Sequence, residues 1–204
     1  MSNRERISAN NATIQACIDK ANALPNASGG GGLTPSEGLT FAESYHNATF
    51  ANNYGWTGFG TCTDTEIVVP SLTPEGYPVI SVGSWNDDPD NSFSGVWVQG
   101  VSKIYLPDTV REVVPMGFMC GDILKYIKFG KYLRDVDSMQ YADGTNPPTD
   151  VVLDLSDFAL STPPVLEDTS LFTGVIEVRV PSAMVDKFKT ATNWSVAADK
   201  IVGV

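Results

Sequence analysis

The sequence predicts a repeat solenoid of the α/β type: a short leucine-rich repeat whose strands stack into a parallel β-ribbon with irregular turns. We also expect an N-terminal helix and a C-terminal capping helix and strand. The main observation is an internal repeat in which six apolar pairs share one offset of 23 residues: Ile104 and Ile127, Leu106 and Phe129, Val110 and Leu133, Val113 and Val136, Met116 and Met139, and Phe118 and Tyr141. This offset lies within the range of about 20–29 residues typical of leucine-rich repeats, where each unit adds one strand. Because stacked repeats form mainly a binding surface, the pattern favours recognition over catalysis.

The second observation is a set of five segments with the same strand pattern. They alternate apolar and polar residues, three of them end in proline, and they lie at residues 65–70, 102–107, 124–129, 151–155 and 176–181. Alternation with a period of two is typical of strands that bury one face, and proline ends a strand because it lacks the ladder N–H. Residues 39–41 predict a further strand, and the aromatic, Asn- and Gly-rich residues 43–60 predict a hairpin.

The N-terminal residues 2–24 predict one helix, which Pro25 ends. Ser2 and Glu5 form a capping box at its start. A heptad seam follows, with a and d positions at Ile7, Ile14, Cys17, Ala21 and Leu24. A seam of about three heptads is too short to be stable alone, so the helix either oligomerises, docks onto a larger assembly or folds back onto its own domain.

The remaining boundaries follow from composition. Four consecutive glycines within residues 26–36 predict a flexible linker. We therefore divide the chain into an anchoring or oligomerisation helix (1–25), a Gly-rich linker (26–36) and a leucine-rich repeat domain (37–204). The apolar residues Met184, Val185, Phe188 and Trp194 predict that the C-terminal segment closes the core, with a partner-binding helix as the alternative.

The charge of the chain excludes several classes of partner. Its 204 residues include 13 Lys and Arg against 24 Asp and Glu, a formal net charge of -11. Such a surface repels a phosphate backbone, so we expect no nucleic-acid partner. The sequence contains no run of about 18 apolar residues, so we expect no membrane insertion. The first residues lack the apolar stretch of a secretory signal, so we expect no leader there.

Few residues offer catalytic or metal-binding chemistry. The three cysteines, Cys17, Cys62 and Cys120, match no zinc spacing, and the single histidine, His46, has no partner motif. The sequence contains no nucleophile elbow, zinc-protease motif, P-loop or dinucleotide fingerprint. We therefore predict a protein that is not an enzyme and that uses no cofactor and no metal ion.

A candidate binding surface lies on the outward face of the ribbon, because residues between the core positions of a strand point away from the core. The residues predicted to face outward are Lys103, Tyr105, Tyr126, Lys128, Val152, Asp154, Glu177 and Arg179. Tyrosine provides a large amphipathic contact area at low entropic cost, and two tyrosines beside lysines are a local exception on an acidic chain. The candidate ligand-binding residues are Lys103, Tyr105, Tyr126, Lys128 and Arg179.

Other interpretations of these features remain open. The outward residues are also compatible with an ordinary exposed ribbon that keeps the protein soluble. A second candidate surface is the aromatic stretch with Tyr45, Phe50, Tyr54, Trp56 and Phe59, which otherwise forms a hairpin over the end of the solenoid. Asp154 and Asp157 are close in sequence, but we expect them to point in different directions, which argues against a carboxylate pair for catalysis.

The repeat resembles the BspA-like family of leucine-rich repeats, common in gut and oral bacteria and in their phages. The matching positions are Ile104, Leu106, Pro107, Val110, Val113, Phe118 and Cys120. Residues 60–83 resemble the first repeat of that family, and residues 180–202 resemble its C-terminal closure. The sequence departs from the family pattern at residues 86–92 and 140–150. The resemblance implies a solenoid without fixed active-site residues.

The N-terminal segment, from Asn10 through the glycines, resembles the start of phage virion fibre or appendage proteins. Together, the two resemblances imply a non-enzymatic phage virion structural protein, of the fibre, decoration or tail-appendage kind. Its expected partners are virion proteins, a host surface protein or a glycan, and we expect a homo-oligomer, for which a trimer is one plausible form. The expected location is the virion, assembled in the host cytoplasm. Alternatives are a bacterial cell-surface or secreted adhesin and a carbohydrate-active enzyme.

Overall fold

The architecture comes from a computed structural model, which describes residues 32–44, 53–85, 93–94, 96–98, 100–115, 117–121, 123–141 and 147–204. The predicted N-terminal helix, with Ile7, Ile14, Cys17, Ala21 and Leu24, lies outside the described residues. So does the segment 86–92, where the sequence departs from the family pattern.

The described chain is mixed α/β, with two mostly parallel six-stranded sheets and few helices. We call the first of these the ribbon sheet, which runs in the order β3 (Glu66–Val68), β8 (Lys103–Tyr105), β11 (Tyr126–Lys128), β14 (Val151–Asp154), β16 (Val175–Val180) and β17 (Ile201–Gly203). The second sheet runs in the order β1 (Thr40–Glu43), β2 (Tyr54–Gly58), β4 (Val79–Val82), β9 (Glu112–Val113), β12 (Asp135–Val136) and β15 (Val165–Leu166).

Two smaller sheets and a few short helices complete the fold. A three-stranded parallel sheet contains β7 (Val96–Val98), β10 (Phe118–Cys120) and β13 (Met139–Tyr141), and an antiparallel pair contains β5 (Ser84–Trp85) and β6 (Phe93–Ser94). The helical elements are α2 (Val185–Thr190) and the 3-10 turns η1 (Ser170–Phe172), η2 (Ser182–Met184) and η3 (Trp194–Ala197).

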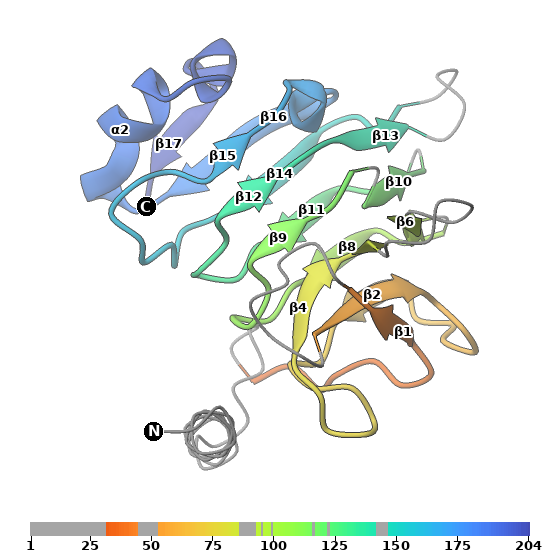
Figure 1. The fold of residues 1–204 in the computed structure, drawn as a ribbon. Coiled ribbons are helices and arrows are strands. Elements are labelled where there is room, and N and C mark those ends of the chain that lie inside the picture. Colours follow the sequence, from red (N-terminus) through yellow and green to blue (C-terminus); the bar gives the residue numbers. More distant parts are fainter. Residues whose placement is uncertain are drawn as a thin grey trace, which may run out of the picture.

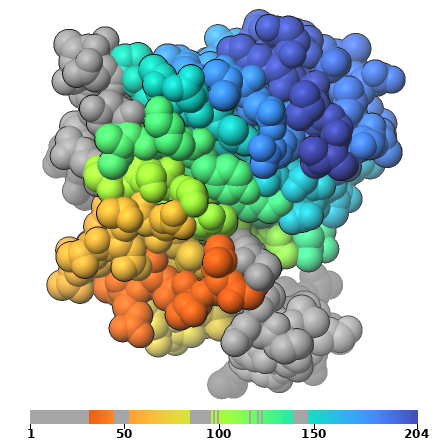
Figure 2. Space-filling view, turned by 180° about the vertical axis from the view of Figure 1, so that it is seen from behind, coloured from red at the N-terminus to blue at the C-terminus, as the bar shows by residue number. Residues whose placement is uncertain are grey.

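Successive passes of the chain visit the sheets in the same order. One pass runs through β8, β9 and β10, and the next runs through β11, β12 and β13, each strand lying parallel to its predecessor. Figure 1 shows the passes stacked in chain order, from β1, β2 and β4 at one end to β16, β17 and α2 at the other. Figure 2 shows the same succession on the rear face. The five predicted strand segments therefore become neighbours in one parallel sheet.

The register confirms the predicted offset in part. Ile104 pairs with Ile127 in the ribbon sheet, and Val113 pairs with Val136 in the second sheet, both 23 residues apart. In the three-stranded sheet, however, Phe118 pairs with Met139, which is 21 residues away, so the predicted pairing of Phe118 with Tyr141 is wrong. The reason is that the connection from β12 to β13 is two residues shorter than that from β9 to β10.

The core lies inside the three parallel sheets. The inward row of the ribbon sheet consists of Ile67, Ile104, Ile127, Leu153, Val178 and Ile201, all of which are buried. The second sheet contributes the buried Val82, Val113, Val136 and Leu166. Burying one such side chain stabilises the fold by about 1.5–3 kcal/mol, so repetition of the row is the main reason that the passes stack.

Each end of the ribbon sheet is covered. At β3, Ser36 is buried, its N–H donates to the Val68 carbonyl at 2.9 Å, and the Val68 N–H donates to Ser36 Oγ at 3.2 Å. Ser36 thus belongs to the packed region, although the sequence placed it last in the linker. The predicted hairpin is shifted, because β1, which corresponds to the strand predicted at residues 39–41, pairs antiparallel with β2 from the end of the aromatic stretch.

At the other end, the expected C-terminal helix and strand are α2 and β17. Phe188 and Trp194 are buried, with their ring centroids 4.8 Å apart in an edge-to-face arrangement. The Trp194 indole N–H donates to the Pro164 carbonyl at 2.8 Å. Met184 is also buried, and Val185 is partly buried against the core. These side chains cover the last pass, as the apolar pattern predicted.

Candidate functional site

The outward face of the ribbon sheet carries the five predicted ligand-binding residues in two adjacent rows. The outward row, in register order, is Val68, Tyr105, Lys128, Asp154, Arg179 and Val202. The flanking row is Glu66, Lys103, Tyr126, Val152 and Glu177. The structure thus brings Lys103, Tyr105, Tyr126, Lys128 and Arg179 together on β8, β11 and β16, with β14 between the last two strands.

Two tyrosines form the aromatic part of this face. The ring centroids of Tyr105 and Tyr126 lie 5.6 Å apart, with the ring planes inclined by 51°. Both side chains are partly exposed. Offset or tilted aromatic pairs at this distance attract each other, so each ring helps to hold the other in position.

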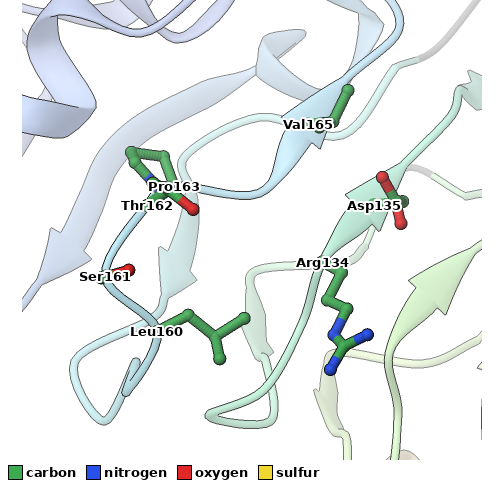
Figure 3. A pocket seen from close by; sticks show the side chains of 7 residues that line it. All are labelled: Arg134, Asp135, Leu160, Ser161, Thr162, Pro163 and Val165. Atoms are coloured by element: carbon green, nitrogen blue, oxygen red, sulfur yellow. The ribbon is translucent and has the colours of Figure 1, made fainter.

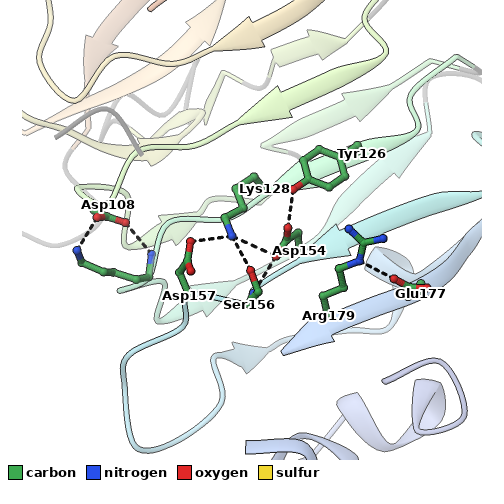
Figure 4. A network of polar contacts seen from close by, with 9 residues as sticks. Asp108, Tyr126, Lys128, Asp154, Ser156, Asp157, Glu177 and Arg179 are labelled. Atoms are coloured by element: carbon green, nitrogen blue, oxygen red, sulfur yellow. Dashed lines mark hydrogen bonds and ion pairs between the residues drawn. The ribbon is translucent and has the colours of Figure 1, made fainter. Parts of the chain in front are cut away.

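Asp154 and Lys128 form the polar centre, shown in Figure 4. The Lys128 ammonium lies 3.2 Å from Asp154 Oδ1, and the Tyr126 hydroxyl donates to Asp154 Oδ2 at 2.5 Å. Asp154 is buried, and the side chain of Lys128 is 15% exposed. Asp154 lies in the outward row, as predicted, but it is not exposed, because Tyr126 and Lys128 close over it.

The turn after β14 adds two further partners. The Lys128 ammonium donates to Ser156 Oγ at 2.7 Å and lies 2.8 Å from Asp157 Oδ2. The Ser156 N–H donates to Asp154 Oδ1 at 2.8 Å, closing an Asx turn. Asp154 and Asp157 therefore converge on one cation, which corrects the expectation that they point in different directions.

The electrostatics of the centre favour a charged Asp154. Burial alone would raise the pKa of this carboxyl, but hydrogen bonds from Ser156 and Tyr126 and the charge of Lys128 outweigh burial and hold the pKa below its ordinary value. Burial and the hydrogen bond to Asp154 raise the pKa of Tyr126. At neutral pH the carboxyl of Asp154 is therefore ionised and the phenol of Tyr126 is neutral.

The other two predicted cations are also paired. The Lys103 ammonium lies 2.8 Å from Glu66, whose hydrogen bond raises the pKa of Lys103. Arg179 Nε donates to Glu177 Oε1 at 2.5 Å, and this bond raises the pKa of Arg179. The expected local excess of positive charge is therefore neutralised, and the face alternates cation and carboxylate.

Sequence reasoning missed Glu66 and Ser156 as members of this face. Glu66 occupies the position that pairs with Lys103, so aligning the first strand segment with the second would have found it. Ser156 follows Asp154 by two residues, the spacing of an Asx turn, which is a readable signal.

A pocket of about 330 Å³, which the sequence did not predict, lies on the second sheet (Figure 3). It is lined by Arg134, Asp135, Leu160, Ser161, Thr162, Pro163 and Val165. Asp135 and Val165 come from the paired strands β12 and β15, and the other wall is the loop before β15. Beside it, the half-buried Arg111 guanidinium lies 5.0 Å from the Tyr132 ring centroid, and burial together with the charge of Arg134 lowers the pKa of Arg111.

The second candidate, the aromatic stretch, divides into core and surface. Trp56 is buried and contacts Phe59 and Phe118 edge-to-face, so it belongs to the core. Tyr54 stacks on Tyr77 with centroids 4.9 Å apart. The other members, Tyr45 and Phe50, lie outside the described residues.

Within the described part of the chain, no three His, Cys, Asp or Glu side chains are grouped so that they could hold a metal ion. None of the helices described is both long enough and apolar enough to cross a bilayer. Comparisons of this chain with family models, with curated proteins and with solved structures found no match.

Proposed function

We propose that this chain is a non-enzymatic phage virion structural protein, a fibre, decoration or tail-appendage component. Its repeat domain is a short leucine-rich repeat solenoid of the BspA-like kind, and the outward face of the ribbon sheet binds host surface components or neighbouring virion proteins. In this proposal the helix that the sequence predicts at the N-terminus attaches the protein to the particle or to other copies of itself. The Gly-rich linker then holds the domain away from the attachment point.

The observation that carries this proposal is the ordered outward face of the ribbon sheet. Tyr105 and Tyr126 lie beside each other, and the charged side chains around them are held by ion pairs, two between adjacent strands and one within β16. Groups held in place before a partner arrives lose little conformational entropy on binding. A recognition surface benefits from such order, whereas an acid–base catalyst needs a group whose pKa lies near the working pH.

The catalytic alternative has less support. Asp154 is the buried carboxylate of the face, and its hydrogen bonds hold its pKa low, which is unsuitable for a general acid. Asp157 shares the Lys128 ammonium with it. A carbohydrate-active enzyme would instead need two carboxyl groups whose pKa values are driven apart.

A second candidate function is that of a bacterial cell-surface or secreted adhesin. The same outward face supports it, as does the resemblance of the repeat to the BspA-like family. The two functions differ in where the protein is found, not in the surface that it uses.

Location on particles is the direct test. Phage particles purified on a density gradient should contain the protein by mass spectrometry, and antibodies against it should label one fixed structure of the particle in electron micrographs. We expect the signal to survive high-salt washing. Loss of the protein in the first wash, with antibody labelling of intact bacterial cells instead, would support the adhesin and contradict the virion role.

Oligomerisation is tested on the full chain by light scattering. The wild type should be a homo-oligomer, and the double variant Ile7→Asp, Ile14→Asp should be a monomer, because charge at a seam position prevents apolar packing. The matched control is Ala12→Asp, which places the same charge outside the predicted a and d positions of the seam. A wild-type monomer would contradict self-association and leave two roles for the helix: docking onto another virion protein, or packing onto its own domain.

A further inference from the structure

We infer that the outward face of the ribbon sheet binds an uncharged glycan chain. The inference rests on the proposed function, since it names the ligand class of that recognition face.

The aromatic rings supply the apolar part of sugar recognition. A pyranose ring has faces made of C–H groups, which pack on an aromatic ring as other apolar groups do. Tyr105 is partly exposed, and its ring is held by Tyr126, 5.6 Å away between centroids. A sugar that stacks on Tyr105 therefore meets a surface that is already in place.

The charges of the face favour an uncharged ligand. Each cation of the two rows is already close to a carboxylate: Lys103 to Glu66, Lys128 to Asp154 and Asp157, and Arg179 to Glu177. An anionic ligand would have to compete with these carboxylates, and a cationic ligand with the ammonium and guanidinium groups. When a charged ligand replaces the protein partner in one of these ion pairs, the number of ion pairs stays the same, but the ligand has to be desolvated. Hydroxyl groups bond to such pairs without breaking them.

Hydrogen-bonding groups remain available at the edge of the network. The side chain of Asp157 is 69% exposed and contacts Lys128 through Oδ2. Arg179 donates to Glu177 through Nε, and within the described residues its terminal nitrogen atoms have no hydrogen-bond partner. The carboxylate of Glu177 and the guanidinium of Arg179 lie side by side and offer an acceptor and donors together, which matches vicinal sugar hydroxyls, each both donor and acceptor.

The shape of the face favours a chain of sugars over a single small molecule. Tyr105, Lys128, Asp154 and Arg179 occupy four neighbouring strands, which are spaced about 4.8 Å apart in a sheet. Contacts thus extend along a line across the sheet and are not gathered in one hollow. Because Asp154 is buried, an extended oligosaccharide passes over it and contacts the partly exposed Tyr105 on one side and Arg179 on the other.

Binding of the full chain to two oligosaccharide panels tests the inference. One panel holds neutral oligosaccharides of glucose, galactose, mannose, rhamnose and N-acetylglucosamine, and the other holds uronic-acid and phosphorylated oligosaccharides. We expect a subset of the neutral panel to bind, with an affinity that hardly changes on raising the salt concentration, since no counterions are released. Binding confined to the acidic panel, or no binding to either panel, overturns the inference.

Two substitutions locate the site. Tyr105→Ala, which removes the stacking ring, should weaken binding of the neutral oligosaccharide at least tenfold, and Asp157→Asn should weaken it several-fold. The matched control is Tyr132→Ala, which removes an exposed tyrosine from the turn between β11 and β12. Unfolding curves of all three variants establish that they fold. Equal affinity in Tyr105→Ala and Tyr132→Ala would overturn the assignment of the site.

An assay on host cells separates failure of this inference from failure of the proposed function. Periodate oxidises vicinal diols and should abolish attachment of the protein to cells, whereas protease treatment of the cells should not. Attachment that is lost after protease but not after periodate identifies a protein receptor: the glycan inference is then wrong, and the proposed recognition role stands.

Discussion

The two faces of the ribbon sheet are built from the same six strands but depend on different physical effects. The inward row repeats one kind of side chain, from Ile67 through Ile127 to Ile201, and every member is buried. The outward row changes at each strand, from the tyrosine Tyr105 to the lysine Lys128 and the carboxylate Asp154. The inward row needs only apolar side chains of suitable size, because the hydrophobic effect has no direction. The outward row needs particular neighbours, because a buried charge is tolerated only when it is paired.

This difference makes the inward row the main source of stability and the outward row a source of order. Deleting a core side chain removes transfer energy and leaves a cavity, whatever its neighbours are. Deleting a member of the outward row has an effect that depends on which partner it leaves behind. The four changes below separate the two rows.

The largest effect is expected for Ile127→Ala on the inward row. Ile127 is fully buried between Ile104 and Leu153, so its truncation should lower the free energy of unfolding by about 2–5 kcal/mol. Urea unfolding followed by tryptophan fluorescence measures this change. The matched control is Ile176→Ala, which truncates the same residue type on β16 where it is 56% exposed, and which should have little effect. Similar losses in both variants would mean that the inward row is not the core.

The next effect is expected for Lys128→Met on the outward row. Methionine keeps most of the side-chain volume but leaves Asp154 buried without its cation, so the free energy of unfolding should fall by about 1–3 kcal/mol. The control is Lys125→Met, which removes a lysine that is 46% exposed and 3.7 Å from Asp150. If Lys125→Met lowered the free energy of unfolding as much as Lys128→Met does, the burial of Asp154 would not explain the effect of Lys128→Met.

The sequence predicts which residues form the inward row of the ribbon sheet. For the outward row it predicts which residues face outward, but not which of their side chains bond to each other. Period-two alternation and the offset of 23 residues locate Ile104 and Ile127 on one face, and the register confirms them. The same alternation places Lys128 and Asp154 outward, but it contains no information about which outward side chains bond to each other. That Asp154 is buried follows from the lengths and rotamers of Tyr126 and Lys128, which no spacing rule encodes. The pairing of Phe118 with Met139 depends on a connection two residues shorter, which a search for one fixed offset misses.

A smaller effect, tied to pH, is expected from Asp154. Its pKa is lower in the folded protein than the ordinary value of about 3.9, so the folded state favours the charged form. The resulting stability is fully present above that ordinary value and is lost as the pH falls through the folded pKa. Asp154→Asn, which cannot titrate, should therefore lose less stability than the wild type between neutral pH and about pH 3. Thermal unfolding at a series of pH values measures this, with the exposed Asp186→Asn as control. Parallel pH curves for wild type and Asp154→Asn would contradict a lowered pKa.

The smallest effect is expected at the edge of the same face, in the pair of Lys103 and Glu66. Their ammonium–carboxylate distance of 2.8 Å is shorter than the 3.2 Å between Lys128 and Asp154, yet their side chains are 42% and 50% exposed. Water screens such a pair, so its coupling energy in a double-mutant cycle of Lys103→Met and Glu66→Gln should be close to zero. The equivalent cycle of Lys128→Met and Asp154→Asn should give a clearly larger coupling, because burial removes that screening. A larger coupling energy in the shorter, exposed pair would mean that the distance between the charges, and not their burial, determines the strength of the ion pairs on the outward face. The order of this face would then not depend on Tyr126 and Lys128 covering Asp154.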